Sequence, residues 1–99
     1  MNSNLNSLEK TSWTFFSNHG HIYFLIANQS NITKREISNM VGISERAVSD
    51  IIKDLVHDGY VKQIKLGRKN NYSIIKNKKL RHNLEKNISL SSLLEVFKV

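Results

Sequence analysis

Apolar residues between positions 44 and 59 recur at the spacing of a helix. Four of them stand at i, i+3, i+4 and i+7 and so share one helical face: Val48, Ile51, Ile52 and Leu55. Ser44 precedes this pattern and can cap the helix, because its hydroxyl can accept from the free backbone amides of the first turn. Gly59 follows the pattern and can end the helix in the left-handed conformation. The pattern predicts an amphipathic helix with one buried face and one polar face.

A shorter helix is predicted directly upstream. Thr33 and Glu36 form the T-x-x-E pattern of a capping box, in which each side chain accepts from the backbone amide of the other residue. The inward positions of this helix are expected to be Ile37, Met40 and Val41. Gly42 permits a tight turn, because glycine adopts backbone angles that a residue with a Cβ resists. Residues 33–59 therefore predict two helices joined by a turn of three or four residues.

A third helix is expected over residues 18–28, with Asn18 as its cap. Its apolar run is continuous, so periodicity alone does not distinguish helix from strand. We predict a helix because the two-helix unit needs a third helix to close its core. The run is apolar on all sides, which implies cover by the terminal segments or by a second copy of the chain. Residues 1–12 are polar and expected to be frayed, whereas Trp13 should be buried in this domain or against a second copy.

The period of the pattern changes after Gly59. Residues 60–66 and 72–75 read as two strands around a Gly- and Asn-rich turn, which predicts a β-hairpin within residues 60–76. A five-residue loop over 67–71 would place Leu66 opposite Tyr72, with both apolar side chains on one face.

The C-terminal segment predicts one more helix, over residues 89–98, capped by Ser89. Its apolar stripe again follows the i, i+3, i+4, i+7 rule: Leu90, Leu93, Leu94 and Phe97. Such a stripe can be ordinary core or a partner surface. We expect a homodimer formed through the first and C-terminal helices, because a small domain with two such surfaces has much apolar area to bury.

The order of these elements predicts a single domain over residues 1–99. Its fold class is mainly α with a small β-hairpin (α+β), comprising a three-helix core, the hairpin and a C-terminal helix. The segments NHGHIYFLIA, TKREISNMVGISERAVSDIIKDLVHDGYV and LGRKNNYSI together resemble the MarR/ArsR-type winged helix-turn-helix transcription regulators of bacteria and archaea.

The resemblance implies how DNA would be bound. The second helix of the motif, residues 44–57, would enter the major groove, and the hairpin tip at 67–71, the wing, would lie on the backbone and minor groove. The residues expected to read bases are Ser44, Glu45, Arg46, Ser49, Asp50 and Lys53. Those expected to contact the backbone are Thr33, Lys34, Lys65, Arg68, Lys69 and Asn70.

Arg46 is the strongest candidate for base recognition. A guanidinium near the start of such a helix can make a bidentate hydrogen bond to guanine O6 and N7. Its alternative is an i, i+4 ion pair with Asp50 on the same helix. Asp50 would then orient Arg46, or else accept from cytosine N4.

The charge balance favours a polyanionic partner. Fifteen Lys and Arg against eight Asp and Glu give a net charge of +7 and a pI of about 9.9. An ordinary basic protein would fit these totals about as well. Between residues 60 and 86, however, nine Lys and Arg face Glu85 alone, so the excess lies next to the helix-turn-helix.

The sequence contains few residues that are arranged for metal binding, cofactor binding or catalysis. His19 and His21 form H-x-H, but on a helix their rings diverge, and with no cysteine or nearby carboxylate cluster we expect neither a metal site nor a cofactor. No nucleophile with its base, phosphate-binding glycine loop or catalytic carboxylate pair is evident, so we expect neither enzyme activity nor a small-molecule ligand. Without a signal peptide or membrane span, the chain is expected in the cytoplasm, associated with the nucleoid when bound to DNA.

These observations predict a sequence-specific regulator of transcription that binds double-stranded DNA, as a homodimer on a pseudo-palindromic site. One alternative is a winged-helix module that binds protein while its basic face stays solvated. Another is an architectural protein that binds DNA without sequence preference.

Overall fold

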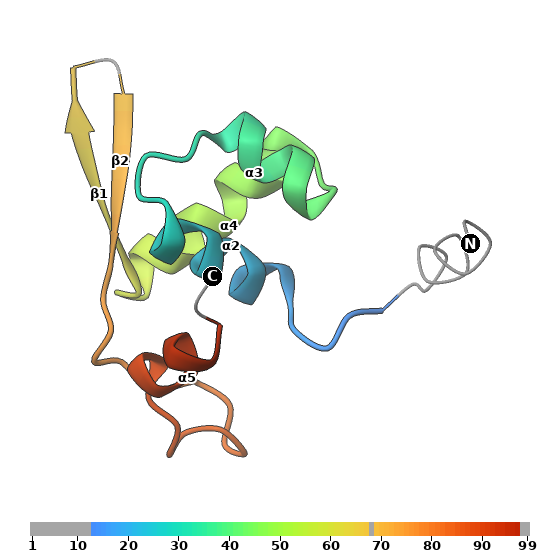
Figure 1. Ribbon diagram of the computed structural model, residues 1–99, viewed down its shortest axis with the longest axis vertical. Coiled ribbons are helices and arrows are strands. Elements are labelled where there is room, and N and C mark those ends of the chain that lie inside the picture. Colours follow the sequence, from blue (N-terminus) through green and yellow to red (C-terminus); the bar gives the residue numbers. More distant parts are fainter. Residues whose placement is uncertain (1–12, 68, 98–99) are drawn as a thin grey trace.

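The computed structural model describes residues 13–67 and 69–97. The elements follow the order α2 (Asn18–Asn28), α3 (Lys34–Val41), α4 (Glu45–His57), β1 (Val61–Leu66), β2 (Lys69–Ile74) and α5 (Leu90–Val96). The two strands form an antiparallel hairpin beside the three-helix core, and α5 lies at the end of the molecule away from the hairpin tip (Figure 1). The predicted fold class is confirmed. The predicted fraying of residues 1–12 falls outside the described residues.

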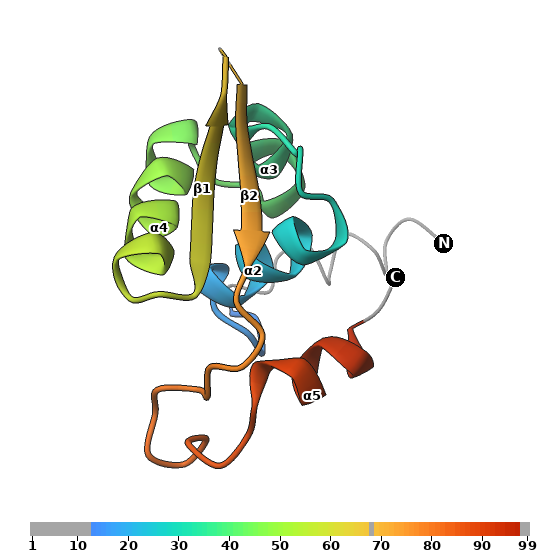
Figure 2. The ribbon, with the colours of Figure 1, turned by 90° about the vertical axis from the view of Figure 1, so that its left-hand side faces the viewer.

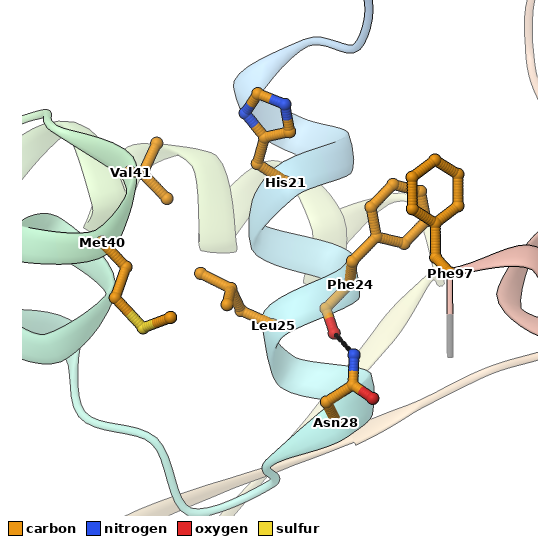
Figure 3. A pocket seen from close by; sticks show the side chains of 7 residues that line it. All are labelled: His21, Phe24, Leu25, Asn28, Met40, Val41 and Phe97. Atoms are coloured by element: carbon orange, nitrogen blue, oxygen red, sulfur yellow. Dashed lines mark hydrogen bonds between the residues drawn. The ribbon is translucent and has the colours of Figure 1, made fainter. Parts of the chain in front are cut away.

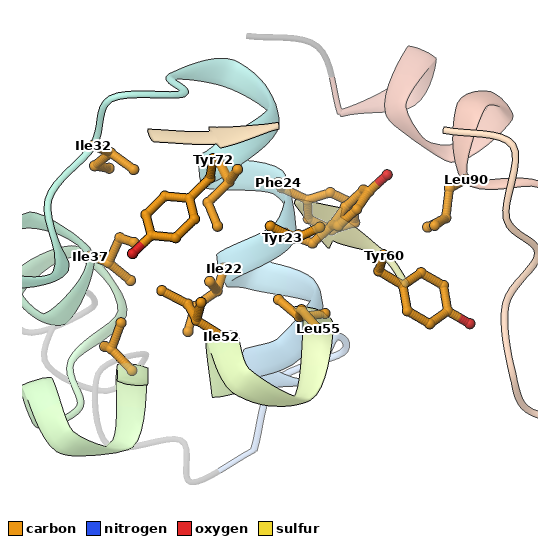
Figure 4. Close-up of a cluster of buried hydrophobic side chains, with 13 residues drawn as sticks. Ile22, Tyr23, Phe24, Ile32, Ile37, Ile52, Leu55, Tyr60, Tyr72 and Leu90 are labelled. Atoms are coloured by element: carbon orange, nitrogen blue, oxygen red, sulfur yellow. The ribbon is translucent and has the colours of Figure 1, made fainter. Parts of the chain in front are cut away.

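Helix α2 lies at the centre of the core. Ile22, Tyr23 and Phe24 are buried (Figure 4), and so is Ile26. The helix packs against α3, α4 and β2, and the Phe97 ring at the end of α5 stacks on Phe24 with the ring centroids 4.3 Å apart. Cover on several sides was predicted, and here the chain itself provides it. The predicted cap was wrong by one residue, because the Ser17 hydroxyl, not the Asn18 side chain, accepts from the Gly20 amide.

The helix-turn-helix forms as its caps predict. Thr33 and Glu36 make both bonds of the capping box, and the Ser44 hydroxyl accepts from the Ala47 amide at 3.1 Å. Gly42 ends α3 in the left-handed conformation with φ +85°. Backbone geometry at both helix starts is therefore fixed by local hydrogen bonds.

Met40 does not lie inward as expected, since its side chain is 65% exposed. In the short helix α3, Ile37 and Val41 stand four residues apart and pack into the core. Met40 falls beside them, at the margin of a shallow groove of about 400 Å³ that Leu25 and Phe97 also line (Figure 3). The predicted inward stripe of α3 is correct for two of its three residues.

The hairpin register differs from the predicted one. Leu66 pairs with Lys69 and Ile64 with Asn71, so only two residues separate the strands, and the five-residue loop was wrong. Gly67 has φ +63°, the positive angle that two-residue hairpin turns require at their first central position. Since register decides which face each residue occupies, Ile64 is turned away from the core and is 47% exposed.

The C-terminal stripe is part of the core of its own chain. Leu90 is buried, and Leu93, Leu94 and Phe97 pack against the core cluster. Ser89 caps α5 as predicted, with its hydroxyl accepting from the Ser92 amide.

The segment before α2 is only partly buried by the described part of the chain, through Phe16. Trp13 is 69% exposed and Phe15 is 87% exposed, although Phe15 touches the Phe16 ring edge-on. Burial of Trp13 within its own domain is therefore not observed. None of the described helices is long and apolar enough to cross a membrane.

We expect opposite effects from alanine at two glycines. Gly42→Ala should lower the free energy of unfolding by about 1 kcal/mol, because a side chain strains the left-handed conformation. Gly20→Ala should raise it by up to about 1 kcal/mol, because alanine favours the helix and the new Cβ would meet its nearest neighbour at an ordinary 3.7 Å. Urea unfolding measures both. A Gly42→Ala variant that is not destabilised would contradict the left-handed turn at this residue, and a Gly20→Ala variant that is destabilised would contradict the space described beside Gly20.

Tyr23 should make stability depend on alkaline pH. Its hydroxyl donates to the Ile75 carbonyl at 3.0 Å, and burial, with a smaller effect of nearby Tyr60, raises its pKa from 10.0 to about 12. The folded protein favours the neutral phenol, so this stabilisation is fully present below pH 10 and is lost as the pH rises toward 12.

The test is Tyr23→Phe, followed by urea unfolding across this pH range. At neutral pH the variant should lose about 1 kcal/mol with the hydrogen bond, and its stability should fall less steeply than that of the wild type above pH 10. Equal slopes for the two proteins would show that Tyr23 does not titrate as proposed.

Candidate nucleic-acid interface

Helix α4 presents a polar face to solvent because its opposite face is buried. Val48, Ile52 and Leu55 are buried against α2 and α3. At about 100° per residue, Arg46 and Lys53 then fall on the outer face. The structure leaves five of the predicted base-reading residues exposed and Ser49 half-buried: Ser44, Glu45, Arg46, Asp50 and Lys53.

The start of α4 is tied to α3 by a contact that sequence reasoning missed. Arg35 Nε lies 3.7 Å from Glu45 Oε2, and both side chains are largely exposed. The pair depends on the angle at which the two helices cross, which neither spacing nor composition reveals. It partly neutralises the carboxylate of Glu45, which is itself one of the predicted groove contacts.

Arg46 does not form the predicted ion pair with Asp50. Within residues 13–67 and 69–97, neither Arg46 nor Lys53 has an acidic partner. The ion-pair alternative for Arg46 is therefore wrong for the free protein. Its guanidinium remains available for another acceptor.

The acidic residues near the end of α4 have basic partners from other elements. His19 Nε2 of α2 lies 2.9 Å from Asp54 Oδ2, and Arg81 donates to Asp58 Oδ2 at 2.9 Å. His19 and His21, which form H-x-H in the sequence, do not share a site. His19 contacts Asp54, whereas His21 lines the groove beside Met40. In the part of the chain that the structure describes, no three His, Cys, Asp or Glu side chains come together to hold a metal.

The residues predicted to contact the DNA backbone differ in their exposure and in their existing hydrogen bonds. Lys65 is exposed on β1 and Lys34 is half-buried at the start of α3. Thr33 is engaged in its capping box, where its amide and then its hydroxyl hold the pKa of Glu36 below the usual range. Asn70 is half-buried, and its Oδ1 atom is enclosed without a hydrogen-bond partner among the described residues. Arg68 and the side chain of Lys69 lie outside the described residues.

Positive charge is divided unevenly between the helices and the hairpin. Residues 33–59 carry four Lys and Arg against five Asp and Glu, whereas residues 60–75 carry four Lys and Arg and no acid. The hairpin can therefore supply attraction to phosphate, while the nearly neutral α4 contributes donors and acceptors.

Residues 17–62 match the family model described as "Winged helix-turn-helix DNA-binding". Over these residues the chain is similar to winged helix-turn-helix DNA-binding domains. The match runs from the cap of α2 into β1 and contains both helices of the motif, which confirms the resemblance inferred from the sequence. The hairpin β1–β2 is the wing of this winged helix-turn-helix.

A solved structure supports the same fold. The zinc-dependent MarR family transcriptional regulator AdcR, in its Zn(II)-bound state, superposes with a TM-score of 0.51 at 24% identity. The alignment covers 75% of this chain and 62% of that regulator. The comparison with curated proteins found no match. The fold of the chain is therefore similar to that of this regulator, and the chain spans less than two thirds of the regulator's length.

Proposed function

We propose that the chain is a sequence-specific regulator of transcription that binds double-stranded DNA through α4 and the wing. The observation that carries the proposal is the distribution of ion pairs and side-chain hydrogen bonds around α4. Glu45, Asp54 and Asp58 each have a basic partner on another element. Arg46 and Lys53 have none among the described residues, so α4 offers its cations to the major groove.

The residues of α4 would divide the work of recognition. Arg46, near the start of the helix, would bond guanine O6 and N7, and Lys53 would contact phosphate. Asp50 does not pair with Arg46 in the free protein, so it would instead accept a hydrogen bond from cytosine N4. Ser44 and Glu45, already engaged at the start of α4, and half-buried Ser49 would make secondary contacts in the groove.

The wing would supply more of the affinity than α4 does. Lys65, Arg68 and Lys69 would contact phosphates beside the groove, together with Thr33, Lys34 and Asn70 at the start of α3 and on β2. Phosphate contacts fix register and affinity but carry no sequence information. This division suits a nearly neutral helix that selects a sequence and a basic hairpin that attracts the duplex.

We propose a homodimer on a pseudo-palindromic site. Trp13 and Phe15, before α2, and Val96 on α5 are all more than half exposed. Phe16 contacts both Phe15 and Phe97, so these terminal segments adjoin one another. Because the stripe of α5 is used within its own chain, the partner would meet this exposed edge rather than the stripe. The function proposed is binding without catalysis, in the cytoplasm and on the nucleoid.

Two substitutions should separate base reading from phosphate contact. Arg46→Ala should remove discrimination at one base position, worth about 1–3 kcal/mol. Lys65→Ala should weaken binding to every duplex equally and lower the slope of log K against log salt by about 0.9. Fluorescence anisotropy on a panel of duplexes at several salt concentrations measures both effects.

Arg46→Lys is the matched control, because it keeps the charge but loses the bidentate geometry. It should retain the salt slope of the wild type and lose discrimination at the same position. Identical sequence profiles for Arg46→Ala and Lys65→Ala would contradict the division of roles. If the wild type bound no duplex even at low salt, the DNA-binding function itself would be wrong, leaving the protein-binding alternative.

A further inference from the structure

The segment that follows the wing in the sequence carries as much net positive charge as the wing itself. The connector, residues 76–89, joins β2 to α5 and carries five basic residues against Glu85: Lys76, Lys78, Lys79, Arg81 and Lys86. Its net charge of +4 equals that of residues 60–75, whereas residues 33–59 sum to −1. The functional assignment above uses only Arg81, as the partner of Asp58, and gives the other four basic residues of the connector no role.

The connector and the DNA-reading elements lie at opposite ends of the molecule. Along the longest axis, whose extent is 43 Å, the hairpin tip is at one end and the connector at the other (Figures 1 and 2). Helix α4 starts toward the tip of the hairpin and ends toward its base (Figure 2). A duplex that lies across the hairpin tip and the start of α4 therefore leaves the connector facing away from it.

Hydrogen bonds hold the connector in an ordered path. The Leu80 amide donates to the Ile88 carbonyl at 3.2 Å, and the Leu90 amide donates to the Lys78 carbonyl at 3.0 Å. The Tyr60 hydroxyl donates to the Lys79 carbonyl at 3.0 Å, which ties the connector to the base of the wing. Its cations thus extend from a fixed backbone, which reduces the entropy lost on binding.

Three of these cations are free to bind. Arg81 is paired with Asp58, and Lys78 lies over the Tyr60 ring with its Nζ 5.3 Å from the centroid. The other three are exposed and have no ion pair in the described part of the chain: Lys76, Lys79 and Lys86.

We propose that the connector is a second phosphate-binding surface, without sequence preference, whose partner is a second segment of duplex DNA. The connector contains no Phe, Tyr or Trp, and the Nδ1 atom of its one histidine, His82, accepts from the Leu84 amide, so it offers a poor platform for the unstacked bases of a single strand. Lysines alone suit the backbone of a duplex. This inference rests on the proposed function, because a protein held on DNA by α4 and the wing meets neighbouring duplex at high effective concentration.

An anionic membrane is the competing partner, since Leu84 in the same loop is 88% exposed. Stable attachment to a membrane, however, takes more than a basic patch and two exposed aliphatic side chains, Leu84 and Ile88. The connector meets the requirement for phosphate attraction and not the requirement for insertion. Vesicle binding is therefore an outcome that the experiment must separate from duplex binding.

The test is capture of a second duplex. Beads carrying a bound duplex are saturated with protein, and retention of a fluorescent duplex of unrelated sequence is measured. The triple variant Lys76→Gln, Lys79→Gln, Lys86→Gln should keep its affinity for the first duplex within about twofold and lose most of the capture. The salt slope of capture should fall by about 0.9 for each phosphate contact removed.

A matched variant removes the same charge from the other end. Lys34→Gln, Lys53→Gln, Lys65→Gln should weaken binding to the first duplex by at least about tenfold at moderate salt, because several phosphate contacts are lost together. If two DNA-reading faces of a dimer were responsible for capture, this variant would abolish capture while the connector variant retained it. Thermal melting of both variants checks that these exposed substitutions leave the fold intact.

Three results would overturn the inference. They are unchanged capture by the connector variant, no capture by wild-type protein that binds the first duplex, and stronger retention of single-stranded RNA or phosphatidylglycerol vesicles than of duplex. A wild-type protein that fails to bind the first duplex would instead contradict the proposed function. The two failures are thus distinguishable in one experiment.

Discussion

The burial of α2 on nearly all of its sides is the constraint on which the rest of the structure depends. An apolar run such as Ile22 to Ala27 cannot face water along its length, so α3, α4, β2 and the end of α5 all pack around it. Because α4 is pressed against α2 through its apolar stripe, only its polar face remains for solvent. The orientation of Arg46 and Lys53 thus follows from the core.

The distribution of charge then divides the exposed surface into a nearly neutral helix, α4, and two basic segments, the wing and the connector. The acids around α4 are mostly occupied by partners on α2, α3 and the connector. This leaves a recognition helix that attracts phosphate weakly, between a basic wing and a basic connector. A regulator built in this way would derive its affinity from the hairpin and its choice of sequence from α4.

Local signals in the sequence predicted much of this arrangement, whereas signals that depend on tertiary geometry did not. The capping box at Thr33 and the cap at Ser44 were correct because a cap involves residues three apart. The hairpin register was wrong because turn length depends on the conformation of Gly67, which its neighbours do not determine. The contact between Arg35 and Glu45 depends on a helix crossing angle, and no pattern along the chain encodes that angle.

Selection of bound sequences from a random pool of duplexes, with wild-type protein and Arg46→Ala in parallel, is the most direct measurement of whether α4 reads DNA. The wild type should enrich a short motif containing a guanine, in two half-sites about 10–10.5 base pairs apart if the protein is dimeric. Arg46→Ala should enrich the same motif without that guanine. Efficient binding with no enriched motif, or an identical motif from both proteins, would contradict base reading by Arg46 on α4.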